Sequence, residues 1–346
     1  MAMPDVTIRG AGIFGLSIAW ACLQRGARVQ VIDPYGVGAG SSGGIVGALA
    51  PHTPENWNAK KAFQFDSLIA AESFWAEIDA TSGLSSGYAR TGRLQPVPDE
   101  AALERANARA INAETLWQGQ AVWRVVQADR DWAPLSPTGY LIHDTLSARV
   151  HPRQACTSLA AAITARGGGI LSDVPDQGAV IWATGAQGLE QLTQELGRPI
   201  GGANKGQAAL LQPSRPLPPD EAQIFADTVH IIPHADGTIA IGSTSEPDFD
   251  DPVATDDKLD SVIARARAAV PALNDATLIA TWAGLRPRSR SRAPVLGAHP
   301  TQAGHFIANG GFKIGFGMAP RIAAVMADLV LDGADHIPDA FRLETA

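Results

Sequence analysis

Three glycines near the start of the chain constrain the fold more than any other feature. A short run of strand-forming residues, Val6–Arg9, leads directly into Gly10-Ala11-Gly12-Ile13-Phe14-Gly15, and an apolar helical pattern continues to Gly26. Residues 27–32 supply a second strand that ends at Asp33, at the distance from the first glycine where an acidic side chain meets a ribose hydroxyl. The pattern predicts the start of a dinucleotide-binding βαβ unit.

Each glycine of the motif has a physical task. Gly10 permits a tight turn, Gly12 lets the backbone approach a pyrophosphate, and Gly15 allows the helix and strand to pack closely. The diphosphate would lie at the N-terminus of the helix, where backbone amides are unpaired. Arg9 departs from the pattern, because a buried parallel strand usually carries an apolar residue at that position.

Length and composition exclude several other classes of protein. The chain has 346 residues, enough for about two domains. Its formal net charge of −8 argues against binding to nucleic acid. The two cysteines, Cys22 and Cys156, supply neither a disulfide framework nor a metal-ligand cluster. We expect both to be small buried hydrophobes. No apolar run is long enough to span a bilayer, and the few residues before the first strand are too short for a secretory signal, so we expect a cytoplasmic protein.

The loop after the second strand carries a more specific signal. It reads Gly38-Ala39-Gly40-Ser41-Ser42 and then Gly47-Ala48-Leu49-Ala50-Pro51, where a plain NAD-binding fold would continue with a helix and a third strand. Its apolar residues argue against a flexible glycine-serine linker. Similar loops, followed in the same order by five later stretches, occur in the FAD-dependent D-amino-acid oxidase superfamily, which includes glycine oxidase and sarcosine oxidase. The chain resembles this family over most of its length, in residues 38–51, 179–186, 205–207, 229–242, 282–287 and 306–315.

The resemblance implies an α/β fold with two domains. One is a Rossmann-type, GR2-like FAD-binding domain, and the other is a mixed-sheet α+β substrate domain whose active site lies against the first. We expect the FAD-binding domain to comprise residues 1–85, 145–205 and 283–346, and the substrate domain to comprise residues 86–144 and 206–282.

Noncovalent FAD is the cofactor that the resemblance implies. Family members that attach the flavin covalently use a cysteine in the C-terminal third, and none follows Cys156 here. Ser41 and Ser42 would face the diphosphate, the small residues after them would lie against the isoalloxazine ring, and Val174 would neighbour the adenosine. The expected cofactor-binding residues are Gly10, Ala11, Gly12, Ile13, Phe14, Gly15, Asp33, Pro34, Ser41, Ser42, Gly43, Gly47, Ala48, Leu49, Val174, Ala183, Thr184, Gly185, Arg286, Gly310, Gly311, Phe312, Lys313 and Ile314.

Three residues, two of them also expected to contact the cofactor, are the candidates for the catalytic site. Arg286 stands where the family's Trp-Ala-Gly-Leu-Arg-Pro places an arginine that reaches the substrate carboxylate, a task that suits a planar guanidinium. Lys313 is a second candidate carboxylate anchor. His230 stands where amino-acid oxidases have a tyrosine, and it adds a group that can titrate near pH 6.5.

The implied reaction is oxidation of a Cα–N bond by hydride transfer to flavin N5, giving an imine that hydrolyses to an oxo acid, with H2O2 when oxygen is the acceptor. Glycine, sarcosine, small D-amino acids and proline-like imino acids are candidate substrates. We favour a glycine oxidase of thiamine biosynthesis, although Phe312-Lys313 is closer to sarcosine oxidase. The oligomeric state, homo-oligomer included, is left open.

Three alternatives remain beside this reading. The first is a dehydrogenase that passes electrons to a quinone or another acceptor, because sequence does not reveal oxygen access. The second is the flavin domain of a tRNA-modification enzyme, which the negative charge disfavours. The third is a noncatalytic flavin-binding module, but an arginine that points into the pocket argues against it.

Overall fold

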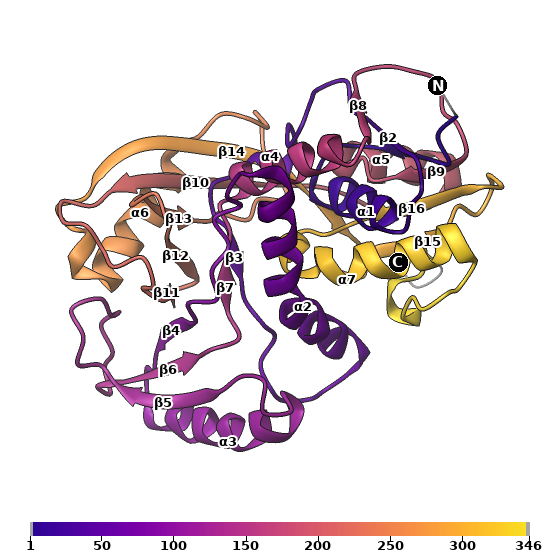
Figure 1. Ribbon diagram of the computed structural model, residues 1–346. Coiled ribbons are helices and arrows are strands. Elements are labelled where there is room, and N and C mark those ends of the chain that lie inside the picture. Colours follow the sequence, from indigo (N-terminus) through magenta and orange to yellow (C-terminus); the bar gives the residue numbers. More distant parts are fainter. Residues whose placement is uncertain (1–2, 344–346) are drawn as a thin grey trace.

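Strands from widely separated parts of the chain meet in two large sheets. The computed structural model describes residues 3–343, and within them Figure 1 shows a parallel-rich sheet on one side and a larger mixed sheet on the other. The first sheet has six strands in the order β15-β16-β9-β1-β2-β8. Its strands are β1 (Val6–Arg9), β2 (Val29–Ile32), β8 (Gly169–Leu171), β9 (Ala179–Trp182), β15 (Val295–Ala298) and β16 (His305–Asn309).

The six-stranded sheet has the connectivity that the glycine motif predicts. Strand β1 pairs in parallel with β2 on one side and with β9 on the other, while β15 is the antiparallel edge strand. Helices α1 (Ile13–Gln24), α4 (Pro152–Ala165), α5 (Gly185–Leu196) and α7 (Gly315–Ala327) pack around this sheet (Figure 1). The short strand β8 lies in the crossover between α4 and β9.

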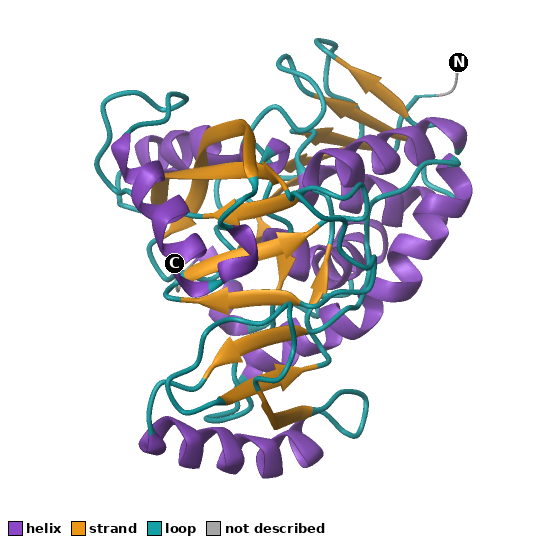
Figure 2. Cartoon of the chain, turned by 90° about the vertical axis from the view of Figure 1, so that its left-hand side faces the viewer, coloured by secondary structure: helices purple, strands orange, loops and turns teal. Residues whose placement is uncertain are grey.

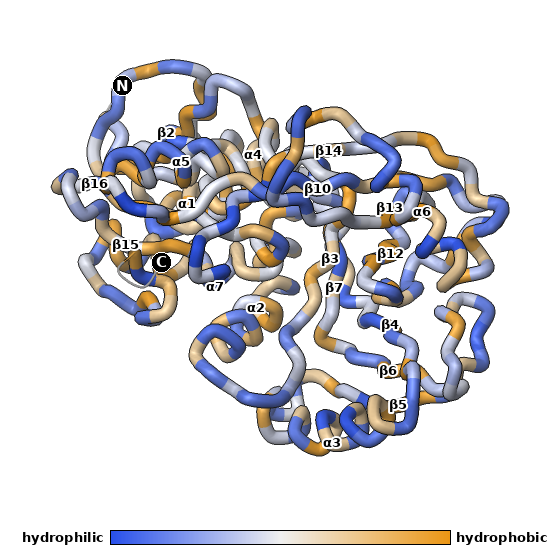
Figure 3. The backbone as a smooth tube through the Cα atoms, turned by 180° about the vertical axis from the view of Figure 1, so that it is seen from behind, coloured by the Kyte–Doolittle hydropathy of each residue, from blue (hydrophilic) through white to orange (hydrophobic). Residues whose placement is uncertain are grey.

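Helix α1 is buried on nearly every side. Leu16, Ile18 and Trp20 are shielded from solvent because the helix lies between the sheet and its neighbours α4 and α7. The long helix α2 (Ala59–Ser82) also packs on α7. It begins at Asn58, whose side chain accepts a hydrogen bond from the amide of Lys61, and it ends at Gly83 in the left-handed conformation. In Figure 3 hydrophilic and hydrophobic residues mix along α2, as expected of a helix with one buried face.

The second sheet has eight strands in the order β14-β10-β13-β12-β11-β4-β6-β5 within the described residues. It is mixed, because β11 and β4 pair in parallel while the other neighbours are antiparallel. A small pair, β3 (Ala48–Leu49) with β7 (Ala148–Arg149), lies beside it. The eight strands are β4 (Arg93–Pro96), β5 (Trp123–Gln127), β6 (Tyr140–Asp144), β10 (Gly201–Gln212), β11 (Gln223–Ala226), β12 (Val229–Pro233), β13 (Ile239–Gly242) and β14 (Thr277–Ser289).

Side-chain alternation gives the eight-stranded sheet two different faces. Leu94, Ile224, Ile231 and Ile241 point to one face, where they form a buried cluster with residues of α6 (Asp257–Ala269). The residues between them in the sequence therefore face the opposite side. Helix α3 (Glu100–Leu116) covers the far end of this sheet, at the bottom of the molecule in Figures 1 and 2.

The fold class inferred from the sequence is confirmed: a Rossmann-type sheet is joined to a second, mixed sheet. The domain boundaries stay a prediction. The two longest strands, β10 and β14, run across the boundaries expected at residues 205/206 and 282/283, and they pair with each other over most of their length. No helix among residues 3–343 is long and apolar enough to cross a membrane.

Candidate active site

One elongated cavity of about 1150 Å³ is lined by residues of both large sheets. At one end it reaches the N-terminus of α1 and the end of β2, and at the other it reaches the free face of the eight-stranded sheet. We call these the cofactor end and the substrate end. All three expected catalytic residues, Arg286, Lys313 and His230, line it. So do these expected cofactor-binding residues: Gly10, Gly12, Ile13, Phe14, Asp33, Pro34, Ser41, Ser42, Gly47, Ala48, Leu49, Ala183, Thr184, Gly185, Gly311, Phe312 and Ile314.

Five expected cofactor residues do not line the cavity: Ala11, Gly15, Gly43, Val174 and Gly310. Gly15 has a packing task instead, because a Cβ there would collide with the carbonyl oxygen of Gly10. Val174 lies in the loop after β8, and its carbonyl accepts a hydrogen bond from Arg9. Contact of these five residues with the cofactor stays a prediction.

The cofactor end presents backbone amides and a fixed carboxylate. Gly10 has φ 110°, and a Cβ there would run into the carbonyl of Ala183 on the neighbouring strand turn. At the start of α1 the amide of Ile13 donates to Ser42 Oγ at 3.0 Å. Asp33 Oδ2 accepts from the amide of Ala11 at 2.8 Å, so its carboxylate is held at the carboxyl end of β2.

Arg9, the charged residue that departs from the apolar strand pattern, lies at the edge of the cofactor end. Its Nε donates to Asp176 Oδ1 at 2.7 Å, and the guanidinium is partly exposed on the cavity wall. The charge is therefore paired and in contact with solvent rather than sealed inside the sheet.

Residues 44–50, the small-residue strip, are fixed by hydrogen bonds to their backbone carbonyls and by close packing. His234 Nε2 lies 2.9 Å from the carbonyl oxygen of Ile45, and Gln64 Nε2 donates to the carbonyl of Ala50 at 3.2 Å. A Cβ on Gly47 would collide with the carbonyl of Val150. The strip therefore keeps one fixed path along the cavity, and all of its residues line the open space.

These features fit the FAD that the sequence resemblance implies. The N-terminus of α1, where Gly12 lines the cavity, suits a diphosphate, and the carboxylate of Asp33 suits a ribose. The strip 44–50 leaves room for a flat ring system, and the N-terminus of α7, around Gly315, also faces the cavity. A helix N-terminus favours negative charge, which a reduced flavin carries.

Arg286 dominates the substrate end. Its Nη2 donates to Ser243 Oγ at 2.8 Å and its Nη1 donates to the carbonyl of Thr244 at 3.2 Å, so the guanidinium is fixed over the end of β13. Burial lowers the pKa of Arg286 to about 10, although Glu246 nearby acts in the opposite direction. The group therefore stays charged at neutral pH, in surroundings where a carboxylate partner would be strongly bound.

Gly206 makes this placement possible. It lies on β10 beside β14, and a Cβ on it would collide with the guanidinium of Arg286. Lys205-Gly206-Gln207, one of the stretches in which the chain resembles the family, therefore supplies the space in which the arginine lies.

His230 differs from the expectation of a group that titrates near pH 6.5. Burial, followed by the charges of Arg93 and Lys313, lowers the pKa of His230 to about 3. The ring packs on Phe225 with a centroid distance of 4.6 Å, and its Nδ1 is buried without a hydrogen-bond partner among the described residues. At neutral pH His230 is an uncharged imidazole at the cavity wall.

Lys313 projects from the turn before α7. Phe312 has φ 43°, and both Lys313 Nζ and the guanidinium of Arg288 lie over its ring, at 5.5 and 5.7 Å from the centroid. Burial, followed by the charges of Arg286 and Arg288, lowers the pKa of Lys313. An anion placed beside Lys313 would relieve this repulsion.

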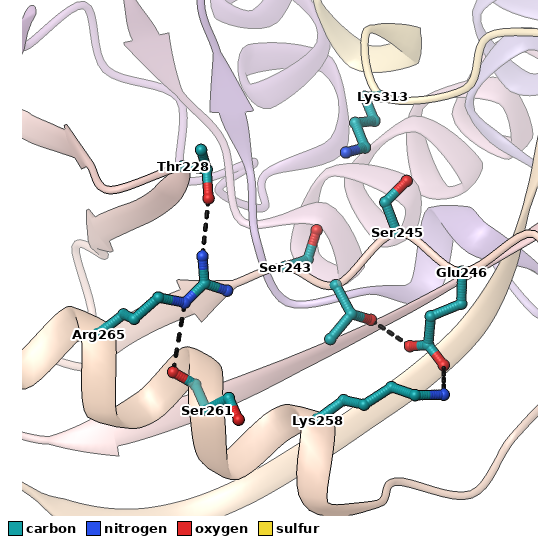
Figure 4. Close-up of a pocket in the computed structure, with 9 residues that line it drawn as sticks. Thr228, Ser243, Ser245, Glu246, Lys258, Ser261, Arg265 and Lys313 are labelled. Atoms are coloured by element: carbon teal, nitrogen blue, oxygen red, sulfur yellow. Dashed lines mark hydrogen bonds and ion pairs between the residues drawn. The ribbon is translucent and has the colours of Figure 1, made fainter.

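A second, shallower cavity of about 440 Å³ adjoins the first (Figure 4). Ser243 and Lys313 line both cavities, so they stand at the junction of the two. In this outer cavity Lys258 Nζ pairs with Glu246 Oε2 at 2.9 Å, and Arg265 donates to Thr228 Oγ1 at 2.8 Å.

Sequence reasoning missed several residues of the large cavity. Arg93 and Ser243 line the substrate end, and His52 and Trp182 line other parts of the wall. Ser243 directly follows residues 229–242, one of the stretches that resemble the family, so its place in the sequence was an available signal. Arg93 carried no such signal, because its position depends on the pairing of β4 with β11.

Comparison with known proteins agrees with this geometry. Residues 5–329 match the DAO family model, described as FAD dependent oxidoreductase. The chain is 28% identical to a glycine oxidase of Pseudomonas putida, over 97% of this chain and 96% of that one. It superimposes with TM-score 0.83 on the glycine oxidase of Geobacillus kaustophilus (21% identity, 98% of both chains). The iminodiacetate oxidase of Chelativorans sp. gives the same TM-score (22% identity, 97% of this chain and 98% of that one). The chain therefore belongs to the DAO family of FAD-dependent oxidoreductases.

Proposed function

We propose that the protein oxidises the Cα–N bond of a small amino acid or an N-substituted glycine. The observation that carries the proposal is the buried, immobilised guanidinium of Arg286 on the wall of the cavity that fits FAD. The relatives named glycine oxidase and the iminodiacetate oxidase structure support it, since their named substrates are amino or imino acids.

Arg286 is the carboxylate anchor in this proposal. Two of its donors form hydrogen bonds with Ser243 and Thr244. The others are available to bind a carboxylate and so orient the Cα–H bond. Lys313 adds a second positive charge, and neutral His230 offers a hydrogen-bonding edge without repelling a cationic or neutral amine. The buried setting favours the neutral amine, the form that can be oxidised.

Bound FAD supplies the electron-accepting chemistry. The chain's own residues bind the substrate, exclude water and hold the amino acid in one orientation. None of them is required as a dedicated base. Noncovalent binding of the flavin and a role in thiamine biosynthesis remain predictions.

The decisive experiment is anaerobic reduction of the purified holoenzyme. Glycine, sarcosine, D-alanine and D-proline are added in turn while the flavin band at about 450 nm is followed. Bleaching by at least one of them is expected. Readmitted oxygen then separates an oxidase, whose colour returns with peroxide, from a dehydrogenase that needs another acceptor. A flavoprotein that no amino or imino acid bleaches would contradict the proposal and favour a noncatalytic role.

A further inference from the structure

Arg93 is a cation at the substrate end that the proposed function leaves unused. On β4 its neighbour Leu94 points into the buried cluster beside α6, so Arg93 points to the opposite face, where it lines the cavity. Asp144, directly across on β6, is fully buried and accepts a hydrogen bond from Arg93 Nε at 2.9 Å.

The ion pair uses only part of the guanidinium. An arginine has five donors, and Nε alone is engaged by Asp144. Within residues 3–343 the two terminal nitrogens of Arg93 make no hydrogen bond, yet they are not among the buried polar atoms without a partner. They are therefore open to the cavity, held by Asp144 in a fixed direction. An immobilised guanidinium whose terminal nitrogens still have donors available is suited to binding an anion.

The register of the sheet separates Arg93 from the carboxylate anchor. One lateral row crosses five strands from Trp282 through Ala208, Gly242 and His230 to Phe225. Arg93 continues the same face on the next strand, β4, two strands beyond His230 and thus about 10 Å from it across the sheet. The guanidinium of Arg286 lies on the other side of His230, over β10 and the end of β13. The two arginines are therefore placed for two groups rather than for one.

Charge at the substrate end supports a second anion. Arg286, Lys313 and Arg93 all line the cavity, and among the described residues Asp33, at the cofactor end, is the one carboxylate that lines it with them. Asp144 offsets Arg93, and Glu246, which faces Arg286 from the outer cavity, is itself paired with Lys258. One substrate carboxylate would therefore leave the substrate end with a net positive charge, which a second anion would balance.

We propose that Arg93, together with the neutral imidazole of His230, forms a second anion subsite, and that the substrate is an amino or imino acid carrying a second carboxylate. The inference rests on the proposed function, because it assumes that Arg286 holds the α-carboxylate. D-glutamate, D-aspartate and iminodiacetate represent the class.

The test compares acids with their isosteric amides. Steady-state kcat/KM is measured for D-glutamate against D-glutamine and for D-aspartate against D-asparagine, with D-alanine as the reference. We expect at least one acid to exceed its amide by about 10-fold or more, as a charge-assisted contact requires. A binding measurement runs beside it: the non-oxidisable succinate should perturb the flavin spectrum at lower concentration than succinamate.

The variants must avoid stranding Asp144 as an unpaired buried charge. The double variant Arg93→Gln/Asp144→Asn removes both charges and keeps a hydrogen-bonding pair. It should bring the acid-to-amide ratio to about 1, because kcat/KM should fall more for the acid than for its amide or for D-alanine. Arg93→Lys retains the charge and should keep part of the preference. The control Arg25→Gln/Asp328→Asn neutralises an exposed ion pair outside the cavity and should leave the ratio unchanged.

The outcomes separate the two proposals. Bleaching by D-alanine with equal rates for acids and amides, or an acid preference that survives in Arg93→Gln/Asp144→Asn, would overturn the second subsite alone. A holoenzyme that no amino or imino acid reduces would overturn the proposed function, and succinate binding would then still report whether Arg93 binds an anion.

Discussion

The two ends of the cavity differ in the kind of group that lines them. The cofactor end is mostly backbone: glycine turns, a helix N-terminus and a strip of small residues, more than half of them from the first fifty residues. The substrate end is mostly side chains, and Arg93, His230 and Arg286 reach it from strands far apart in the sequence. The cofactor end depends on positions where large side chains are absent. The substrate end depends on which side chains the sheet register brings together. Substitutions at the two ends should therefore have separable effects, on FAD binding and on substrate oxidation.

The largest effect is expected from Arg286→Ala. Removing the buried guanidinium should lower kcat/KM for carboxylate substrates by about 100-fold or more, because a charge-assisted hydrogen bond contributes about 1.5 to 3 kcal/mol to binding alone and orientation is lost as well. FAD content should not change. Arg290→Ala, on the same segment but exposed, is the control. Unchanged kinetics in Arg286→Ala would remove the anchor from the proposed function.

A smaller loss is expected from Gly206→Ala. The added methyl group displaces the guanidinium of Arg286, so kcat/KM should fall by about 10-fold, with FAD retained. Gly202→Ala on the same strand adds a methyl group where nothing lies within 4 Å, and it should behave as wild type. Equal kinetics in the two variants would show that Arg286 does not depend on this space.

At the other end, Asp33→Ala should weaken FAD binding with little effect on substrate preference. Loss of the carboxylate should raise the dissociation constant of FAD by about 10-fold, in line with one lost hydrogen bond to a charged group. Flavin remaining after dialysis is the readout, and the exposed Asp173 provides Asp173→Ala as a control. Full flavin occupancy after exhaustive dialysis would speak against the ribose contact.

The smallest effect concerns acid stability. The pKa of His230 is about 3 in the folded protein, below the ordinary value of 6.5, so the unfolded chain binds more protons between these values. His230 therefore costs the native state stability as pH falls below 6.5, by roughly 1 kcal/mol per pH unit. His230→Asn should lose less stability than wild type between pH 6.5 and 5 in urea unfolding. His336→Asn, at an exposed histidine, should match wild type, and parallel curves for all three proteins would contradict a buried neutral His230.

Local patterns were sufficient for much of the cofactor end. The strand Val6–Arg9, the helix that follows the glycine motif and the strand that ends before Asp33 occur where the sequence predicts them. Each depends on short-range signals such as a glycine turn or the period of the apolar residues. Burial of Cys22 and Cys156 is also confirmed.

The substrate end depends on information that is not local. Residues 87–95 resemble a strand in sequence, but Gly87 and Gly92 both have positive φ, so β4 begins only at Arg93. Its parallel pairing with β11 then sets Arg93 beside Gln223, more than a hundred residues away. The burial that suppresses protonation of His230 likewise follows from neighbours on other strands. Motifs identify His230 and Arg286, while only the register shows what surrounds them.

The order of strands in the six-stranded sheet also has a consequence for how the protein is made. Strand β9 lies between β1 and β16, so its second neighbour, His305–Asn309, is synthesised after the whole eight-stranded sheet. A nascent chain must therefore carry an unsatisfied, apolar edge of β9 while residues 183–304, about a third of the chain, are made. The high sequence separation of these contacts predicts slow folding, and completion of the nucleotide-binding half coincides with arrival of the last strands rather than the first.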